Sequence, residues 1–454
     1  MAEVKVFFDR AAGSVKPMHA TNNGPVVRRS DVEAGTLHPF NNNLEPFREA
    51  GIPYGRTHDS SFYHRYGMEH TVDVYYVFPN FDADPTDPKN YDFTCTDQYL
   101  EGFALSGTEV FYRLGHRIEN EIKKYGTRMP RDFKKWAEIC EHIIRHYNEG
   151  WADGYRMNIT YWEIWAEPDL SNNLAPDKCP TWSGTKQEFF EFYHTVATHL
   201  KSLFPSIKVG GPSLAFDLGW AEEFFAQMKA PLDFFSWHGY ASLTEDMTEK
   251  AKKVRELLDR YGLHETENIL NEWSYLRGWD CENMVYSHRH RGKIKGASFS
   301  LAAMCACQDA PVDMLMYYDA RPNEFWNGMF DDTVVGEVLK GYYPFYMFNK
   351  LYRLGDAVDC EGGEDIYLSA AQKGGEATVV FTHYNDNDET EAKDVTVSFN
   401  GFGCDAGTDV SFYLLNDEKD LSLVGQATYY GEKFAITLSV PNYTCYLVRF
   451  TKRA

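Results

Sequence analysis

Short apolar runs alternate with longer segments of helical periodicity from about residue 50 to 355, and this alternation constrains the fold more than any other feature. Such alternation predicts parallel strands joined by crossover helices. Eight units of this kind predict a closed (β/α)8 barrel. We expect strands at 19–24, 51–59, 108–115, 159–167, 207–213, 232–240, 268–274 and 313–320, and the clearest helices at 132–150, 188–204, 248–262 and 343–355.

An open doubly wound sheet is the alternative fold, but no strand is followed by the glycine-rich phosphate loop of a dinucleotide-binding fold. After about residue 356 the pattern changes to period-two alternation between Gly, Asn and Asp turns, which predicts an antiparallel β-sandwich. Residues 3–9 have the pattern of one more strand of this sandwich. We therefore expect a catalytic barrel at 15–355 and an accessory sandwich made of 1–14 and 356–454.

The net charge of −22 argues against nucleic acid or an anionic membrane as a partner, since both would be repelled. The nine cysteines are odd in number and lack paired spacing, which favours a reducing compartment. The first residues show no signal-peptide pattern, so we expect a cytoplasmic protein. The aromatic content of 16% suits apolar walls for flat ligands. The sequence does not fix the oligomeric state and is compatible with a homo-oligomer.

Two glutamates stand where barrel strands should end. Glu167, in IWAEP, ends the fourth predicted strand, and Glu272, in LNEW, ends the seventh. Active sites of (β/α)8 barrels lie at this carboxyl rim. Two carboxylates in one aromatic cleft can divide the roles of acid and nucleophile that glycoside cleavage needs. A pair of structural strand-end residues is the alternative, which we consider weaker because both lie at the rim.

Glu163 lies four residues before Glu167 on the same predicted strand. By strand alternation it shares the inward face but lies lower in the barrel. We therefore expect it to pair with a buried Arg or Lys rather than to contact substrate.

Polar and aromatic side chains also end the second and sixth predicted strands. They either hydrogen-bond sugar hydroxyls or, with Asp319, form a metal site. No close histidine pair stands at a strand end, so metal is the weaker interpretation. These residues are His58, Asp59, Trp237, His238 and Tyr240.

A series of motifs, in order along the chain, resembles glycoside hydrolase family 39, the β-xylosidases and α-L-iduronidases of the retaining barrel clan. GRTHD is similar to the family's second strand, and FEFYHTVATHLKSLFPSIKVGGPS to its helix-to-strand passage. DFFSWHGY resembles the family's sixth strand and ILNEWSY its nucleophile strand. The resemblance covers nearly the whole predicted barrel.

This resemblance implies an exo-acting retaining glycoside hydrolase for xylosides, arabinosides or related sugars, acting without metal or cofactor on a carbohydrate substrate. It implies that Glu167 is the general acid/base and Glu272 the nucleophile, about 5 Å apart. Substrate-binding residues follow from the same motifs. They are His58, Ala166, Trp237, His238, Tyr240, Tyr318 and Glu324.

Ala166 departs from the family pattern, which has Asn before the acid/base glutamate. That Asn binds the sugar 2-hydroxyl, a contact that strengthens in the transition state. Three explanations are open: a weakened enzyme, a substrate with an unusual second carbon, or a neighbour such as His238 that replaces the contact. The alternative function is a non-hydrolytic or weakly active carbohydrate-binding barrel.

Overall fold

The computed structural model describes residues 2–58, 72–119, 122–124, 127–172, 174–322 and 325–453. Within these residues eight parallel strands close a barrel in sequence order, so the predicted (β/α)8 fold is confirmed. Each strand overlaps one of the predicted segments. The barrel strands are β2 (Ala20–Asn22), β3 (Tyr54–Arg56), β4 (Glu109–Leu114), β5 (Tyr161–Ile164), β6 (Lys208–Leu214), β7 (Phe234–His238), β8 (Glu267–Trp273) and β9 (Met314–Tyr317).

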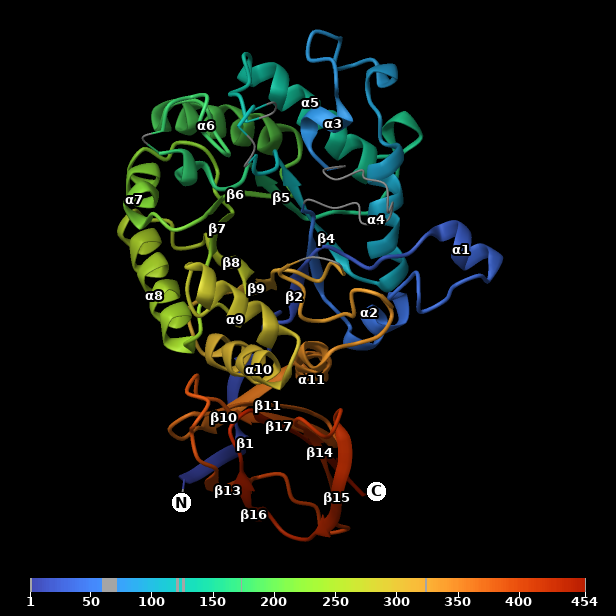
Figure 1. Ribbon diagram of the computed structural model, residues 1–454, viewed down its shortest axis with the longest axis vertical. Helices are drawn as coiled ribbons and strands as arrows, with labels where there is room; N and C mark the ends of the chain where they lie inside the picture. The colour runs from blue at the N-terminus through green and yellow to red at the C-terminus, as the bar shows by residue number, and fades with distance from the viewer. Residues whose placement is uncertain are drawn as a thin grey trace.

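Helices surround this barrel (Figure 1). The α6 helix starts with a capping box, in which Thr185 Oγ1 accepts from Glu188 N and Glu188 Oε2 accepts from Thr185 N, so two otherwise unpaired donors are satisfied. The helices are α1 (Arg29–Ala34), α2 (Leu44–Ala50), α3 (Val74–Val77), α4 (Thr94–Ser106), α5 (Phe133–Asn148), α6 (Lys186–Leu203), α7 (Leu218–Ala226), α8 (Thr244–Arg260), α9 (Cys281–Arg291), α10 (Ile294–Gln308) and α11 (Tyr343–Leu354). Short 3-10 turns are η1 (Pro88–Asn90), η2 (Trp151–Asp153), η3 (Pro168–Ser171) and η4 (Lys340–Tyr342).

The barrel interior is apolar at the bottom and polar above. Phe111, Tyr161 and Phe234 pack together in the lower layer, with ring centroids 5.1–5.6 Å apart. Above it, Nε of the fully buried Arg56 lies 2.7 Å from Oε2 of Glu163. The predicted pairing of Glu163 with a buried cation is confirmed, and the packed lower layer leaves the upper rim as the place for a ligand.

The second domain is one sheet that folds onto itself. Within the described residues it has nine strands in the order β15-β14-β17-β12-β11-β10-β1-β13-β16. Tyr429 of β15 stacks on Phe434 of β16 at 5.1 Å, so the two ends of the sheet face each other across a sandwich core. These strands are β1 (Ala2–Ser14), β10 (Asp356–Glu361), β11 (Ile366–Lys373), β12 (Glu376–His383), β13 (Lys393–Asn400), β14 (Thr408–Leu415), β15 (Ser422–Tyr429), β16 (Lys433–Val440) and β17 (Thr444–Lys452).

One pair in this sheet departs from the antiparallel prediction. The β1 strand pairs antiparallel with β10 but parallel with β13. A strand that arrives from the other terminus has no hairpin connection to its neighbours, so turn geometry does not set its direction.

The two domains meet along α10 and α11, which lie between the barrel and the sheet (Figure 1). Lys295 of α10 is almost fully buried, and its Nζ lies 3.0 Å from Oδ1 of Asp386 and 2.8 Å from Oδ1 of Asp388, both beyond β12. Arg277 of the barrel also donates to Asp386. Among the described residues, no helix combines the length and apolarity needed to cross a membrane.

Candidate functional site

A hollow of about 830 Å³ opens at the carboxyl ends of the barrel strands. It is large enough for a small carbohydrate. Its position is the rim at which the sequence placed the candidate site residues. The predicted residues that line it are His58, Glu167, His238, Tyr240, Glu272 and Tyr318.

Glu272 sits near the end of β8, buried among donors. Its Oε1 lies 2.9 Å from both Arg56 Nη1 and His58 Nε2, and its Oε2 accepts from the Tyr240 hydroxyl at 2.9 Å. Burial alone would raise the pKa of this carboxyl, but neighbours that include His58 and Arg56 outweigh burial and hold the pKa well below its usual range. Glu272 is therefore the ionised member of the pair.

Glu167 follows β5 in a backbone with positive φ, 49°, just before Pro168 begins η3. Two bonds hold this turn: Glu167 N donates to Ser213 O at 2.9 Å, and Thr181 Oγ1 donates to Glu167 O at 2.7 Å. Burial raises the pKa of the Glu167 carboxyl, and the negative charge of Glu272 raises it further, although contact with His238 offsets part of the increase. The two glutamates thus have opposite pKa shifts.

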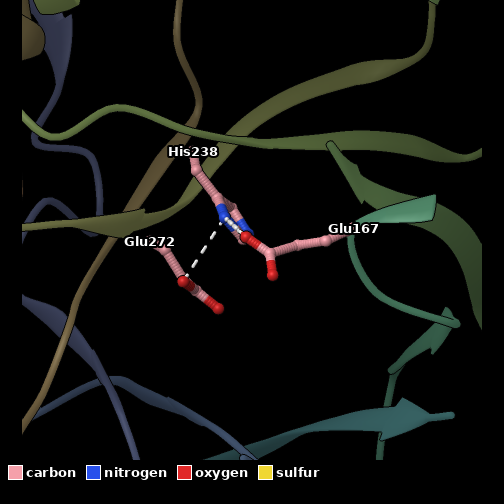
Figure 2. Close-up of side chains that lie close together, drawn as sticks. All are labelled: Glu167, His238 and Glu272. Atoms are coloured by element: carbon pink, nitrogen blue, oxygen red, sulfur yellow. Dashed lines mark ion pairs between the residues drawn. The ribbon is translucent and has the colours of Figure 1, made fainter. Parts of the chain in front are cut away.

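His238 ends β7 and lies between the two carboxylates (Figure 2). Its Nδ1 is 2.9 Å from Glu167 Oε1 and 3.3 Å from Glu272 Oε2, although it is not well aligned with either oxygen. One oxygen of Glu167 and one of Glu272 lie within 4.8 Å of each other. This upper bound on one oxygen pair is compatible with carboxyl groups about 5–5.5 Å apart, the separation typical of a nucleophile and acid/base pair in retaining glycosidases.

Several residues at the hollow were missed by the sequence analysis. Trp279 and Phe216 are mostly exposed at its mouth, and Trp326 packs between Trp279 and Tyr240, with ring centroids 5.9 and 4.8 Å away. Lys250 of α8 donates to the His238 carbonyl, and burial lowers its pKa to about 8. All four lie on loops or a helix, so a search restricted to strand ends does not find them.

Trp237 and Ala166, both predicted to bind substrate, do not line the hollow. Trp237 precedes His238 on β7, and adjacent strand residues face opposite sides, so the indole packs outward and donates to Asn268. Ala166 is 3% exposed beside Glu167. The remaining candidates, Asp59 and Glu324, lie outside the described residues.

Glu167, His238 and Glu272 also have a spacing that a metal ion could use. Their hydrogen bonds favour a pair of hydrogen-bonded carboxylates over a metal site. Glu272 already accepts from Arg56 and Tyr240, and His238 Nε2 is bonded to Ser213 Oγ. In the described part of the chain Asp319 is not in this cluster, and its Oδ1 accepts from Asn23 instead.

Residues 69–274 match the family model of the glycosyl hydrolases family 39. Over 199 residues the chain is 26% identical to a β-xylosidase from Geobacillus stearothermophilus, which covers 37% of this chain and 38% of that protein. The chain therefore matches less than two fifths of the length of these curated relatives.

Two solved structures share the fold over nearly all of both chains. A glucosidase from Croceicoccus marinus has a TM-score of 0.80 at 21% identity, covering 100% of this chain and 99% of its own. A GH39 enzyme from Xanthomonas axonopodis pv. citri has a TM-score of 0.71 at 15% identity, covering 100% and 98%. With the family model and the sequence relatives, the predicted resemblance to glycoside hydrolase family 39 is confirmed.

Proposed function

We propose that this chain is a retaining glycoside hydrolase acting on β-xylosides or closely related glycosides. One observation carries the proposal. Glu167 and Glu272 face one another across the hollow within 4.8 Å, and their pKa values are shifted in opposite directions. A buried acid beside a stabilised carboxylate is the arrangement that double displacement requires.

In the first step, Glu272 attacks the anomeric carbon while Glu167 transfers its proton to the departing glycosidic oxygen. The products of this step are the free alcohol and a glycosyl ester of Glu272. In the second step Glu167 takes a proton from water, whose oxygen attacks the anomeric carbon and releases the Glu272 carboxylate. The sugar leaves with its original anomeric configuration.

The choice of substrate rests on the relatives and on the walls of the hollow. The sequence relative is described as a β-xylosidase. His58, His238 and Tyr240 lie deep beside the carboxylates, as sugar-binding groups should. Trp279 and Phe216 at the mouth offer flat apolar surfaces to a second sugar or another leaving group.

A second candidate function follows from Ala166. Without the amide that the family places there, the barrel is a weakly active or non-hydrolytic carbohydrate-binding protein. Measurable turnover of an aryl xyloside by the unmodified chain, lost in Glu272→Ala, favours the hydrolase. Sugar binding without turnover favours the alternative.

The roles of the two glutamates are separated by Glu167→Ala. In this variant the first step should stay fast on glycosides with very good leaving groups and become slow on poor ones, because only the latter need a proton. Turnover of the activated glycosides is then limited by the second step, which has lost its base. Azide should partly restore turnover on activated substrates by replacing the deprotonated water. Equal loss on both substrate types, with no effect of azide, would contradict the acid/base assignment.

A further inference from the structure

Ser213, near the end of β6, is a fully buried residue next to the candidate catalytic pair. Its Oγ lies 2.9 Å from Arg56 Nη2, 3.1 Å from Asn271 Nδ2 and 2.6 Å from His238 Nε2. The backbone before it runs close to β5, and a Cβ on Gly211 would meet the Ile164 carbonyl oxygen at 2.8 Å. The glycine therefore allows β6 to approach closely enough for this hydroxyl to join three other strands.

The direction of each hydrogen bond at Ser213 follows from its neighbours. A guanidinium can only donate, so Arg56 occupies one lone pair of the hydroxyl. Asn271 Nδ2 also lies 2.7 Å from Oε1 of Glu163, a carboxylate paired with Arg56, so this end of the amide is the NH2 group and also donates. With both lone pairs used, the hydroxyl proton of Ser213 is directed to Nε2 of His238.

We propose that Ser213 is a positioning residue that holds His238 in its neutral tautomer with the proton on Nδ1. Because Nε2 accepts the serine proton, the ring proton must lie on Nδ1. A second ring proton, on Nε2, would face an oxygen without a free lone pair. The imidazolium form then forms only if the bond from Arg56 or from Asn271 is broken.

The consequence for catalysis rests on the proposed function. Nδ1 lies between Glu167 and Glu272, so a neutral N–H there offers one proton to both carboxylates without adding a positive charge. A nearby imidazolium would stabilise the ionised form of Glu167 and weaken it as an acid. The serine thereby keeps Glu167 protonated for the first step.

Charged and titratable groups surround His238 on every side. The two carboxylates on the Nδ1 side favour a positive ring. Arg56 behind Ser213 and Lys250 at the His238 carbonyl oppose it. The Ser213 hydrogen bond adds to the opposing side. Groups one contact further away are Glu163 beside Arg56, and His58 and Tyr240 at Glu272.

Nitrogen-15 NMR of the histidine-labelled full chain tests the tautomer without any assay of activity. Loss of signals in His238→Gln assigns the ring. At neutral pH His238 should show a protonated Nδ1 and an unprotonated Nε2. A protonated Nε2 at this pH, in either the other tautomer or the imidazolium, would overturn the proposal even if the chain is an active glycosidase.

Ser213→Ala should change this pattern to the imidazolium or the other tautomer and move the alkaline limb of kcat/KM to lower pH by about one pH unit, the effect of a cation within about 4–6 Å of a carboxyl. Ser236→Ala is the matched control, since Ser236 Oγ donates to Glu163 in the same polar layer and accepts from Ser213 N. It should keep the wild-type ring pattern. If Ser213→Ala keeps that pattern, or both variants lose it alike, Ser213 has no specific role.

Discussion

Nη1 of Arg56 lies 2.9 Å from Oε1 of Glu272, with the guanidinium fully buried and the carboxylate nearly so. The same guanidinium binds Glu163 through Nε. One cation therefore neutralises a structural carboxylate below the hollow and the candidate nucleophile at its floor. Stability and catalysis depend here on a single side chain.

Arg56→Met should lower the free energy of unfolding by about 3–5 kcal/mol, because it leaves buried carboxylates without their cation. Chemical denaturation measures this change. The control is Arg260→Ala, whose partner Glu222 and own side chain are both exposed; it should cost less than about 1 kcal/mol. Equal losses in the free energy of unfolding for the two variants would show that the buried Arg56 ion pairs contribute no more to stability than an exposed one.

The pH dependence of kcat/KM should be bell-shaped. The pKa of Glu272 is lowered, so kcat/KM rises at acid pH as this group deprotonates. The deprotonation, and with it the rise in kcat/KM, is complete well below neutrality. The pKa of Glu167 is raised, so its proton persists above the range of an ordinary glutamate, and activity falls when it is lost. Glu167→Gln should abolish the alkaline limb on substrates with good leaving groups. An unchanged limb would assign that ionisation to another residue.

Ala166→Asn should raise kcat/KM on aryl xylosides by tenfold or more, since the 2-hydroxyl contact is worth several kcal/mol in such enzymes and about 1.4 kcal/mol is tenfold. Ala166 lies between Trp165 and Glu167, both at positive φ, so a side chain at this position sits in the same turn as the acid. The matched substrate is the 2-deoxy glycoside, on which no gain is expected. No gain on any substrate would reject the lost-contact explanation.

Asp386→Ala should lower the free energy of unfolding by about 2 kcal/mol, because Asp386 accepts charged or short hydrogen bonds from Arg277 and Tyr275 of the barrel. Asp420→Ala removes an exposed ion pair with Lys340 at the same domain junction and should cost less than about 1 kcal/mol. Thermal unfolding compares the two. A negligible effect at Asp386 would show that the junction does not depend on this carboxylate.

The sequence was sufficient to locate the barrel, because its short apolar runs alternate with longer segments, several of which have clear helical periodicity. It also placed Glu167 and Glu272 at the rim, since both end such runs. The pairing of Glu163 with a cation followed from strand alternation, but its partner did not. Arg56 reaches Glu163 across 107 positions, and that contact depends on the stagger of the closed barrel.

The sequence pattern did not predict the aromatic residues at the mouth of the hollow or the hydrogen bonds of Ser213. Trp279 and Trp326 lie in connections whose paths no periodicity describes. The bonds of Ser213 require side chains from β3, β7 and β8 to converge on β6. Trp237 was misassigned because it neighbours His238 in sequence, whereas alternation directs it to the opposite face.

The central claim is that Glu272 becomes bonded to the sugar. Incubation with an activated 2-deoxy-2-fluoro-xyloside, followed by digestion and mass spectrometry of the peptides, tests it directly, because this substituent slows hydrolysis of the glycosyl ester more than its formation. The account predicts loss of activity with one sugar attached per chain, on Glu272, and no attachment in Glu272→Gln. A label on another residue, or full turnover of ordinary substrate by the Glu272→Gln variant, would contradict it.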